Sequence, residues 1–255
     1  MGQLAGLTLR HLKRGLYAAA GLTLVLGFSL WLVPLPERLN TAPSTVVTYR
    51  DGSLAHAFLA PDDRWRIAVD LDRVDPDYLR ALIRFEDKRF YSHPGVDPLA
   101  IGRALVSNMG AGRVVSGGST ITSQLVRMVE PRPRTLWSKA VEAFRAVQLE
   151  AHLSKRDILE RYLTFLPYGR NVEGIEAAAW MTFGHSAEQL APAEIAVLLA
   201  VPQRPNQRRP STSHRATLTA ARNQIANRLH QDGIFDADEL HELMATQVPT
   251  IVRPL

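Results

Sequence analysis

The sequence predicts a mainly α-helical protein with a short β-hairpin element and an N-terminal transmembrane helix. Apolar residues recur at helical spacing along most of the chain from residue 75 onward. Before that point, a turn sequence separates two short runs of the kind that form paired strands. Nearer the N-terminus stands an apolar run without any charge. With 46% hydrophobic residues among 255, the chain has enough apolar side chains for a packed core.

Residues 16–33 read LYAAAGLTLVLGFSLWLV, about 18 residues without a charge, which is just long enough to cross the core of a bilayer. Basic residues precede this run and Glu37 follows it. Because positive residues stay on the cytoplasmic side, we expect a cytoplasmic tail over 1–15 and a signal-anchor helix over 16–33. A cleaved signal peptide and a buried core helix are the alternatives. No small-x-small cleavage site directly follows the run, and the run is apolar on every face, so a retained anchor is favoured.

Residues 34–74 are predicted to form a β-rich linker. The runs STVVTY and LAHAFL flank Arg50-Asp51-Gly52-Ser53, a turn signal, and the run WRIAVDL follows them. We therefore expect a hairpin and a third strand within residues 44–70, in one small β element that joins the anchor to the main body.

The main body is predicted over residues 75–210, with a helical C-terminal connector over 211–255. Asp75 is suited to cap a helix, and Pro76 would take the first helical position. Gly233 is expected to end one helix of the connector, and Asp236 to open the next. After the helix that Asp75 opens, helices are expected over 100–109, 121–129, 136–153, 154–162, 171–183, 192–201, 215–231 and 236–245.

Composition limits the classes of function. The chain has no cysteine, which excludes disulfides, thiolate metal sites and a cysteine nucleophile. The formal net charge of +5 indicates an anionic partner. Nucleic acid, an acidic membrane surface and a phosphate-bearing substrate would all satisfy that charge. No recognisable nucleic-acid-binding motif accompanies it, so we expect no nucleic acid partner.

Glu86 is the most informative residue of the first predicted helix. At helical spacing, Leu79, Leu82, Ile83 and Phe90 form an apolar stripe, and Glu86 lies in the middle of it. An ionised, unpaired carboxylate is costly to bury, so packing alone does not explain its position. Burial also raises the pKa of a carboxyl toward the range useful for general acid–base catalysis. The alternative is that the helix frays before Glu86 and exposes it.

A Gly/Ser-rich segment, SGGSTITSQ over 116–124, leads into a predicted helix. Free backbone N–H groups at such a helix start can bind an anion. Gly112 and Gly117 have the spacing of a nucleotide-binding loop, but Gly118 stands where that loop needs its lysine, so a nucleoside triphosphate site is rejected. A plain helix-capping loop is the alternative. Downstream, the charges from Lys139 to Tyr162 read as the solvated face of an amphipathic helix, and position alone does not single out Glu142.

Five segments together resemble glycosyltransferase family 51, the glycan-polymerising domain of class A penicillin-binding proteins and of monofunctional transglycosylases. The resemblance covers roughly residues 45–210, and five motifs in order make it specific. The run RVVSGGSTIT with a single following Gln is most similar to the 1C type. Ser123, Ser138 and Thr164 stand where the family usually has Gln, Arg and Asn. The segments are EDKRFYSHPG (86–95), GGSTITSQ (117–124), SKAVE (138–142), SKRDILERYL (154–163) and LAPAEIAVLLAVPQRP (190–205).

The resemblance implies a lysozyme-like fold with a small, membrane-facing jaw lobe. It also implies a peptidoglycan glycosyltransferase in the cytoplasmic (inner) membrane, single-pass, with its catalytic domain on the periplasmic or extracellular side. The donor would be a glycan strand on undecaprenyl diphosphate, and the acceptor 4-hydroxyl of lipid II would attack it with inversion. Partners would be the membrane, lipid II, the lipid-linked glycan strand and cell-wall synthesis proteins.

The same resemblance assigns roles to residues. Glu86 would be the general base, and Glu142 would support the leaving group, with a divalent cation such as Mg or Mn at the diphosphate. No organic cofactor and no protein-held metal site are expected. The other substrate-binding residues implied are Asp87, Arg89, His93, Gly118, Ser119, Thr120, Gln124, Arg127 and Lys139.

Two other functions remain open. A lysozyme-like enzyme that cleaves glycan also suits one carboxylate in an α-rich fold, but it needs neither an anchor nor cations beside the Gly/Ser segment. A catalytically silent scaffold for cell-wall synthesis is the other, although both glutamates are intact. Penicillin-sensitive transpeptidases need Ser-x-x-Lys and Lys-Thr-Gly, and neither occurs in these 255 residues, so we expect no transpeptidase activity in this chain.

Overall fold

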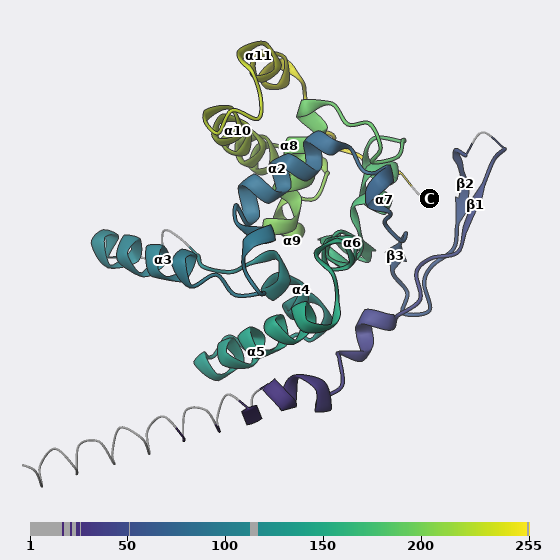
Figure 1. Ribbon diagram of the computed structural model, residues 1–255. Helices are drawn as coiled ribbons and strands as arrows, with labels where there is room; N and C mark the ends of the chain where they lie inside the picture. The colour runs from purple at the N-terminus through teal and green to yellow at the C-terminus, as the bar shows by residue number, and fades with distance from the viewer. Residues whose placement is uncertain are drawn as a thin grey trace, which may run out of the picture. The chain divides into compact units, whose positions relative to one another are not determined.

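The computed structural model describes residues 17, 21, 24–25, 27–50, 52–112, 117–253 and 255 (Figure 1). The chain divides into two compact units, one up to Pro36 and one over Glu37–Leu255. The predicted cytoplasmic tail and part of the predicted transmembrane run lie outside the described residues. Among the residues that are described, no helix is both long and apolar enough to span a membrane. The membrane anchor therefore stays a prediction, as do the domain boundaries at 74 and 210.

The second unit is mainly α-helical, as the sequence predicts. Each helix expected within residues 75–245 is found, although one starts later than expected. A short helix at the end of the fifth motif was not foreseen. The helices are α2 (Pro76–Glu86), α3 (Pro98–Ala111), α4 (Ile121–Val129), α5 (Leu136–His152), α6 (Lys155–Phe165), α7 (Ile175–Thr182), α8 (Pro192–Ala200), α9 (Pro205–Arg208), α10 (Arg215–Gln231) and α11 (Ala237–Ala245).

The local start signals act as the sequence predicts. Asp75 caps α2 by accepting hydrogen bonds from the backbone N–H groups of Asp77 and Tyr78, and Pro76 takes the first helical position. Ser154 caps α6, and Asp236 caps α11. These caps satisfy backbone donors that the first helical turn leaves free, so they fix where each helix begins.

The predicted hairpin is confirmed, and the third strand belongs elsewhere. Val46–Thr48 (β1) pairs antiparallel with Leu54–Ala57 (β2). Trp65–Arg66 (β3) does not join this pair; it runs parallel to Val172–Glu173 (β5). Pro167–Gly169 (β4) pairs with β5 on its other side. The expectation of a single β element over residues 44–70 was therefore wrong, because β3 finds its partner about a hundred residues further along the chain.

The helix expected over 171–183 starts only at Ile175. Residues 172–173 are drawn into the second sheet, where Glu173 forms an ion pair of 2.7 Å with the fully buried guanidinium of Arg66 on β3. Gly174 follows with φ of 90°, and a Cβ at this position would lie 2.9 Å from the carbonyl oxygen of Thr164. The close approach of α6 thus fixes a turn at Gly174 and delays the helix.

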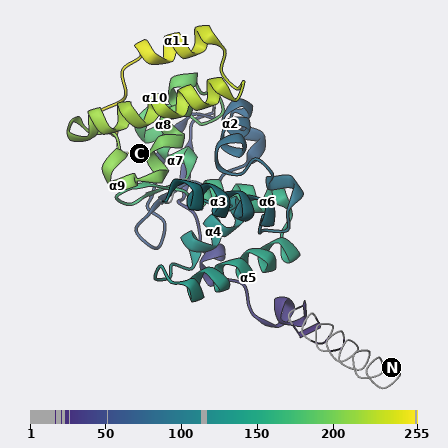
Figure 2. The same cartoon turned by 90° about the vertical axis from the view of Figure 1, so that its left-hand side faces the viewer.

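The core that positions the site has two layers of helices. α4 lies between α5 and α6 and buries Ile121, Leu125 and Val126 completely or nearly so. α8 is apolar and buried from Ile195 onward and packs against α10, which lies beside it in both views (Figures 1 and 2). α2 contacts both α8 and α10, so the C-terminal end of α2 is held between the two layers.

Candidate active site

The C-terminal end of α2 opens into a cavity of about 390 Å³, here called the Glu86 cavity. Its walls come from the end of α2, the segment before α4, the start of α3, the turn after α8, and α10. The lining is dominated by polar and charged side chains. They include Glu86, Asp87, Lys88, Arg89, Asp97, Arg103, Ser119, Thr120, Gln124, Gln203 and Arg228.

Glu86 is the last residue of α2 and is held by a chain of hydrogen bonds. Gln124 Nε2 donates to Glu86 Oε2 at 3.0 Å, and the buried Tyr162 hydroxyl donates to Gln124 Oε1 at 3.2 Å. The helix does not fray before Glu86, so that alternative is wrong. The side chain lies half-buried at the cavity wall, where the sequence pattern predicted a carboxylate among apolar neighbours.

Burial raises the pKa of Glu86 above the ordinary carboxyl value of 4.5. Hydrogen bonds from Gln124 and Gln203 and the charge of Arg228 oppose this rise, while the neighbouring Asp87 adds to it. A carboxylate in a water-poor site with a raised pKa is a stronger base than an exposed one. Glu86 is therefore electrostatically suited to accept a proton.

Asp87 and His93 form a buried clasp behind the Glu86 cavity. His93 Nε2 lies 2.9 Å from Asp87 Oδ2, and the backbone N–H of Gly95 donates to His93 Nδ1 at 3.2 Å. A nitrogen that accepts cannot carry a proton, so His93 is neutral and donates from Nε2 to Asp87. Asp87 also accepts from the backbone N–H of Ile121 at 2.9 Å. The clasp ties the end of α2 to the start of α4; His93 does not line the cavity.

The Gly/Ser segment is described from Gly117 onward, and Ser116 lies outside the described residues. Thr120 caps α4 in a capping box with Ser123, and its hydroxyl donates to the carbonyl oxygen of Gly95 at 2.6 Å. The segment therefore caps α4, which explains a serine at 123, while its binding of an anion stays a prediction. Gly118 lies against α3, where a Cβ would stand 2.9 Å from Ile101 Cγ1. The backbone of the segment therefore packs directly against α3, and there is no room for a side chain at position 118.

Glu142 forms a second charged group, opposite the start of α4. Its Oε1 accepts from Arg127 Nη2 at 2.6 Å and from Lys139 Nζ at 3.3 Å. Arg127 Nη2 also lies 3.5 Å from the hydroxyl of Ser119. These side chains line a cavity of about 500 Å³, together with Arg132 and other residues of the turn between α4 and α5. Four cations (Arg127, Arg132, Arg134 and Lys139) and two carboxylates (Glu130 and Glu142) line this cavity, which leaves a net positive charge in it.

Ser119 joins the two charged groups. It lines the Glu86 cavity, the Glu142 cavity and a third cavity of about 510 Å³ between α3 and the start of α5. The third cavity is mainly apolar, with Ile101, Leu105 and Leu136 among its lining residues. The three cavities therefore adjoin one another at Ser119 and are together called the cleft; one holds Glu86, one holds the charged group of Glu142, and the third is apolar.

Of the predicted substrate-binding residues, most line this cleft. Arg89 lines the Glu86 cavity, but its guanidinium is paired with Asp97 at 3.1 Å, and Gln124 contacts Glu86 rather than the Glu142 group. Residues without a predicted role complete the Glu86 cavity: Gln203, Arg103 and Arg228. Tyr162 acts behind it, through its hydrogen bond to Gln124. Gln203 lies in the fifth motif, and this position could have marked it as a site residue. The sequence around Arg228 does not mark it as a site residue, because it is one of several arginines on an ordinary helix.

The side chains around Glu142 do not form a metal site by themselves. Among the described residues, no three His, Asp or Glu side chains are grouped so as to hold a metal ion. The two carboxylates of this cavity, Glu130 and Glu142, are each paired with Arg or Lys side chains. Mg²⁺ often binds through one or two carboxylates and substrate phosphates. A divalent cation here would depend on the substrate's own oxygens.

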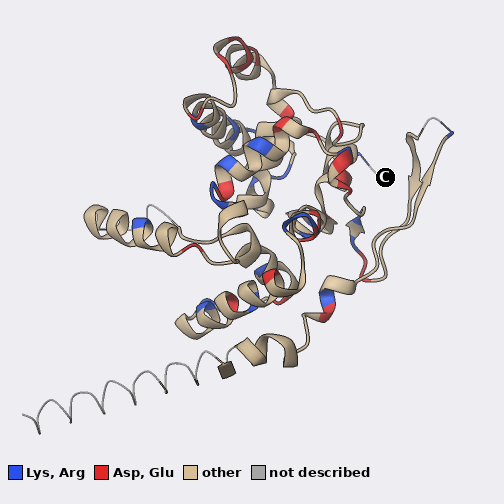
Figure 3. Cartoon of the chain, in the orientation of Figure 1, with Lys and Arg blue, Asp and Glu red and all other residues tan. Residues whose placement is uncertain are grey.

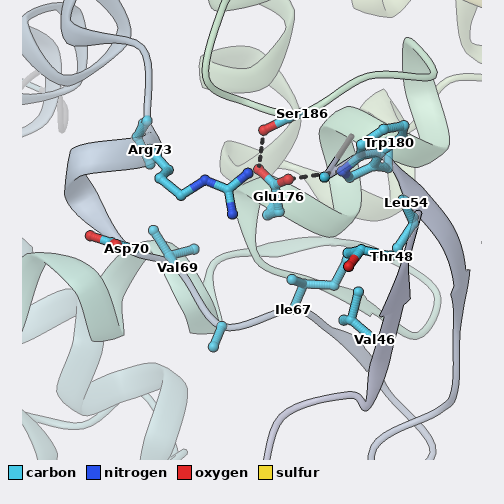
Figure 4. Close-up of a pocket in the computed structure, with 13 residues that line it drawn as sticks. Val46, Thr48, Leu54, Ile67, Val69, Asp70, Arg73, Glu176, Trp180 and Ser186 are labelled. Carbon is cyan, nitrogen blue, oxygen red and sulfur yellow. Dashed lines mark hydrogen bonds between the residues drawn. The ribbon is translucent and has the colours of Figure 1, made fainter. Parts of the chain in front are cut away.

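A smaller cavity of about 110 Å³ lies between the hairpin and α7, apart from the cleft (Figure 4). Glu176 reaches into it and accepts hydrogen bonds from Trp180 Nε1 at 2.8 Å and from the Ser186 hydroxyl at 3.3 Å. The backbone N–H of Ala187 donates to the same carboxylate at 2.9 Å. Glu176 thus fastens the loop after α7, and its acceptor capacity is used within the protein.

Comparison with known proteins assigns the class. A family model described as transglycosylase matches residues 51–230, and the chain belongs to this family. It is 41% identical over 214 residues to penicillin-binding protein 1C of Escherichia coli, covering 84% of this chain and 27% of that protein. It is 31% identical to penicillin-binding protein 1A of Aquifex aeolicus, covering 91% of this chain and 32% of that protein. The predicted family is therefore confirmed.

The chain spans about a quarter to a third of the length of these relatives. The crystal structure of penicillin-binding protein 1A from Haemophilus influenzae aligns with 88% of this chain and 22% of that chain, at a TM-score of 0.45 and 17% identity. The match to the transglycosylase model identifies this chain as a transglycosylase domain like those of class A penicillin-binding proteins.

Proposed function

We propose that this domain polymerises lipid II into glycan strands by inverting transfer from an undecaprenyl-diphosphate donor. Family membership supports the reaction class. The observation that carries the proposal is the position of Ser119, which lines both the cavity of Glu86 and the positively charged cavity of Glu142, so that the two cavities adjoin. A glycosyl transfer with an anionic leaving group needs a base at one end and positive charge at the other.

In the proposed mechanism, Glu86 takes the proton of the acceptor sugar's 4-hydroxyl. That oxygen attacks the anomeric carbon of the donor from the face opposite its diphosphate, and the carbon–oxygen bond to the diphosphate breaks. Gln124 holds the carboxylate in position through its bond to Oε2. The new glycosidic bond forms as the electron pair leaves with the diphosphate, so the configuration inverts.

Arg127 and Lys139 would stabilise the negative charge that develops on the leaving diphosphate. Both side chains already point at Glu142, which holds them together before substrate binds. Preorganised cations of this kind lower a transition state without the cost of rearranging solvent. No step of this mechanism passes through a metal ion.

The apolar side of the cleft supports a membrane-bound substrate. α3 is almost free of charge in Figure 3, with Arg103 as its single charged residue. Met109 on α3 is 82% exposed and Trp137 at the start of α5 is 76% exposed. Exposed apolar patches of this kind often contact membranes. We propose that this side contacts the bilayer, with the run over 16–33 as a single-pass anchor in the inner membrane.

The proposal is tested by polymerisation of labelled lipid II by the purified full chain in detergent, with Mg²⁺, with Mn²⁺ and with a chelator. Glycan strands that vanish with a donor-mimicking inhibitor such as moenomycin are the expected result. Cleavage of finished glycan without polymer would instead indicate the lysozyme-like hydrolase. Neither activity from well-folded protein would indicate the scaffold.

Glu142→Gln is expected to slow polymerisation roughly tenfold to a hundredfold, because a charge-assisted hydrogen bond contributes about 1.5–3 kcal/mol. The amide would hold Arg127 and Lys139 less firmly at the leaving group. Initial rates at saturating lipid II measure the effect. Glu130→Gln is the matched control, since Glu130 lines the same cavity but pairs with Arg132 and Arg145. Equal losses in both variants would contradict the role given to Glu142.

A further inference from the structure

α10 is fastened to the end of α2 on both sides of Glu86. Asp232, the residue that ends α10, accepts from Arg84 Nη2 at 2.9 Å and from Lys88 Nζ at 3.2 Å. Arg84 and Lys88 stand two residues before and two residues after Glu86. The last turn of α10 is therefore fixed relative to the carboxyl, although the two helices are separated by more than a hundred residues.

Arg228 stands one helical turn before Asp232, so both side chains lie on the same side of α10. Its guanidinium lies 4.8 Å from the ring centroid of Phe85, the residue that precedes Glu86, and it lines the Glu86 cavity. A cation over an aromatic face is attracted to the ring but keeps its charge. The Phe85 ring thus orients Arg228 without neutralising it.

Charge pairing distinguishes Arg228 from Lys88 and Arg89, two other cations that line this cavity. Lys88 is paired with Asp232, and Arg89 with Asp97. Arg228 forms no ion pair with any carboxylate in the part of the chain that the structure describes, and its charge opposes the effect of burial on the pKa of Glu86. The other groups facing Glu86 are Asp87, Tyr78, Tyr162, Gln124 and Gln203, and Arg103 lines the same cavity from α3.

We propose that Arg228 is a positioning residue of the reaction, which acts through Glu86 by holding it as the charged carboxylate inside the cleft. The inference rests on the proposed role of Glu86 as the base. A buried carboxyl favours its neutral form, which cannot accept a proton. Arg228 offsets that preference from a helix that contributes none of the five motifs.

The direct test is a carboxyl titration that does not depend on activity. The full chain is labelled with ¹³C at the glutamate carboxyl, and the Glu86 signal is assigned by its loss in Glu86→Gln. In Arg228→Gln the midpoint of the Glu86 titration should move to higher pH, and Arg228→Lys should restore it toward wild type. Arg228→Met keeps an apolar stem over the Phe85 ring and replaces Arg228→Gln if that variant is poorly folded. An unchanged midpoint in the neutral variants would overturn the proposal.

The pH dependence of polymerisation gives the second readout. The acidic limb of the rate profile should shift upward in Arg228→Gln, with a rate about tenfold lower on that limb and little change on the plateau at higher pH, because tenfold corresponds to one pKa unit. Arg84→Gln is the control: it removes one of the two cation contacts with Asp232 that hold α10 to α2, but it keeps the cation over Phe85. A lower melting temperature with an unmoved limb in both variants would mean that Arg228 is only structural. Absence of polymer from wild type would refute the proposed function and leave the titration to decide on Arg228.

Discussion

Glu86→Gln should abolish measurable polymerisation while the protein stays folded. The amide has nearly the shape of the carboxyl, so the side chain can still accept the hydrogen bond from Gln124. The amide cannot, however, take a proton from the acceptor hydroxyl. Loss of a general base costs about 10²–10⁴-fold in rate. The measurement is the initial rate of lipid II polymerisation at saturating substrate, with a thermal unfolding curve for each protein.

The stability of this variant has a predictable sign. The folded protein binds the Glu86 proton more tightly than the unfolded chain, because burial raises the pKa above 4.5. The contribution of Glu86 to the unfolding free energy is therefore full below that pH and is lost as the pH rises through the folded-state pKa. The amide of Glu86→Gln does not titrate and so carries no buried charge at neutral pH. At that pH the variant should therefore be as stable as wild type or more so. A variant that keeps most of its activity would show that Glu86 is not the base.

Gly95→Ala is expected to destabilise the protein by about 3 kcal/mol or more, since both a clash and a strained backbone are introduced. Gly95 has φ of 90°, a region that side-chain-bearing residues rarely adopt. A Cβ there would lie 2.5 Å from the carbonyl oxygen of Ala146 in α5. For a domain of this size, the expected fall in melting temperature is roughly 6–12 °C.

Substitutions at two other glycines distinguish the effect of the steric clash from the effect of the strained backbone. Gly233 has φ of 75°, and a Cβ at this position would have nothing within 4 Å, so Gly233→Ala should cost only about 1–2 kcal/mol. Gly102 lies inside α3 in open space, and Gly102→Ala should stabilise by about 0.5–1 kcal/mol. If Gly95→Ala lowers the unfolding free energy by no more than Gly233→Ala, the turn after α2 has room for a side chain, and the predicted clash with α5 is wrong.

The candidate site could be predicted from the sequence where its signals are local. Glu86 stood out because a helix repeats within four residues, so a carboxylate among apolar positions is visible in a short segment. The Gly/Ser segment stood out because its glycines and hydroxyl residues are neighbours in the chain, directly before a helix. Glu142 did not, and only the family resemblance pointed to it: its partner Lys139 is an ordinary neighbour on the same helix, and Arg127 meets it only through the packing of α4 on α5.

The roles of several predicted residues depend on contacts that no pattern reveals. Asp87 and His93 bind each other and the start of α4, so they brace the site from behind. Gln124 was predicted to bind substrate, and the structure shows that its side chain also holds Glu86. These differences arise because the turn over 87–95 folds back on α4, which only the tertiary structure shows.

The sequence by itself determined the family, most of the helices and several of their starts, since caps such as Asp75 and apolar periodicity act within a few residues. The tertiary structure alone decided which distant segments meet. It placed β3 beside β5, and it placed Arg228 beside Glu86, which stands 142 residues earlier in the chain. Such contacts follow from how whole helices and strands pack to bury their apolar faces, and that information is spread over the entire chain rather than held in any one segment.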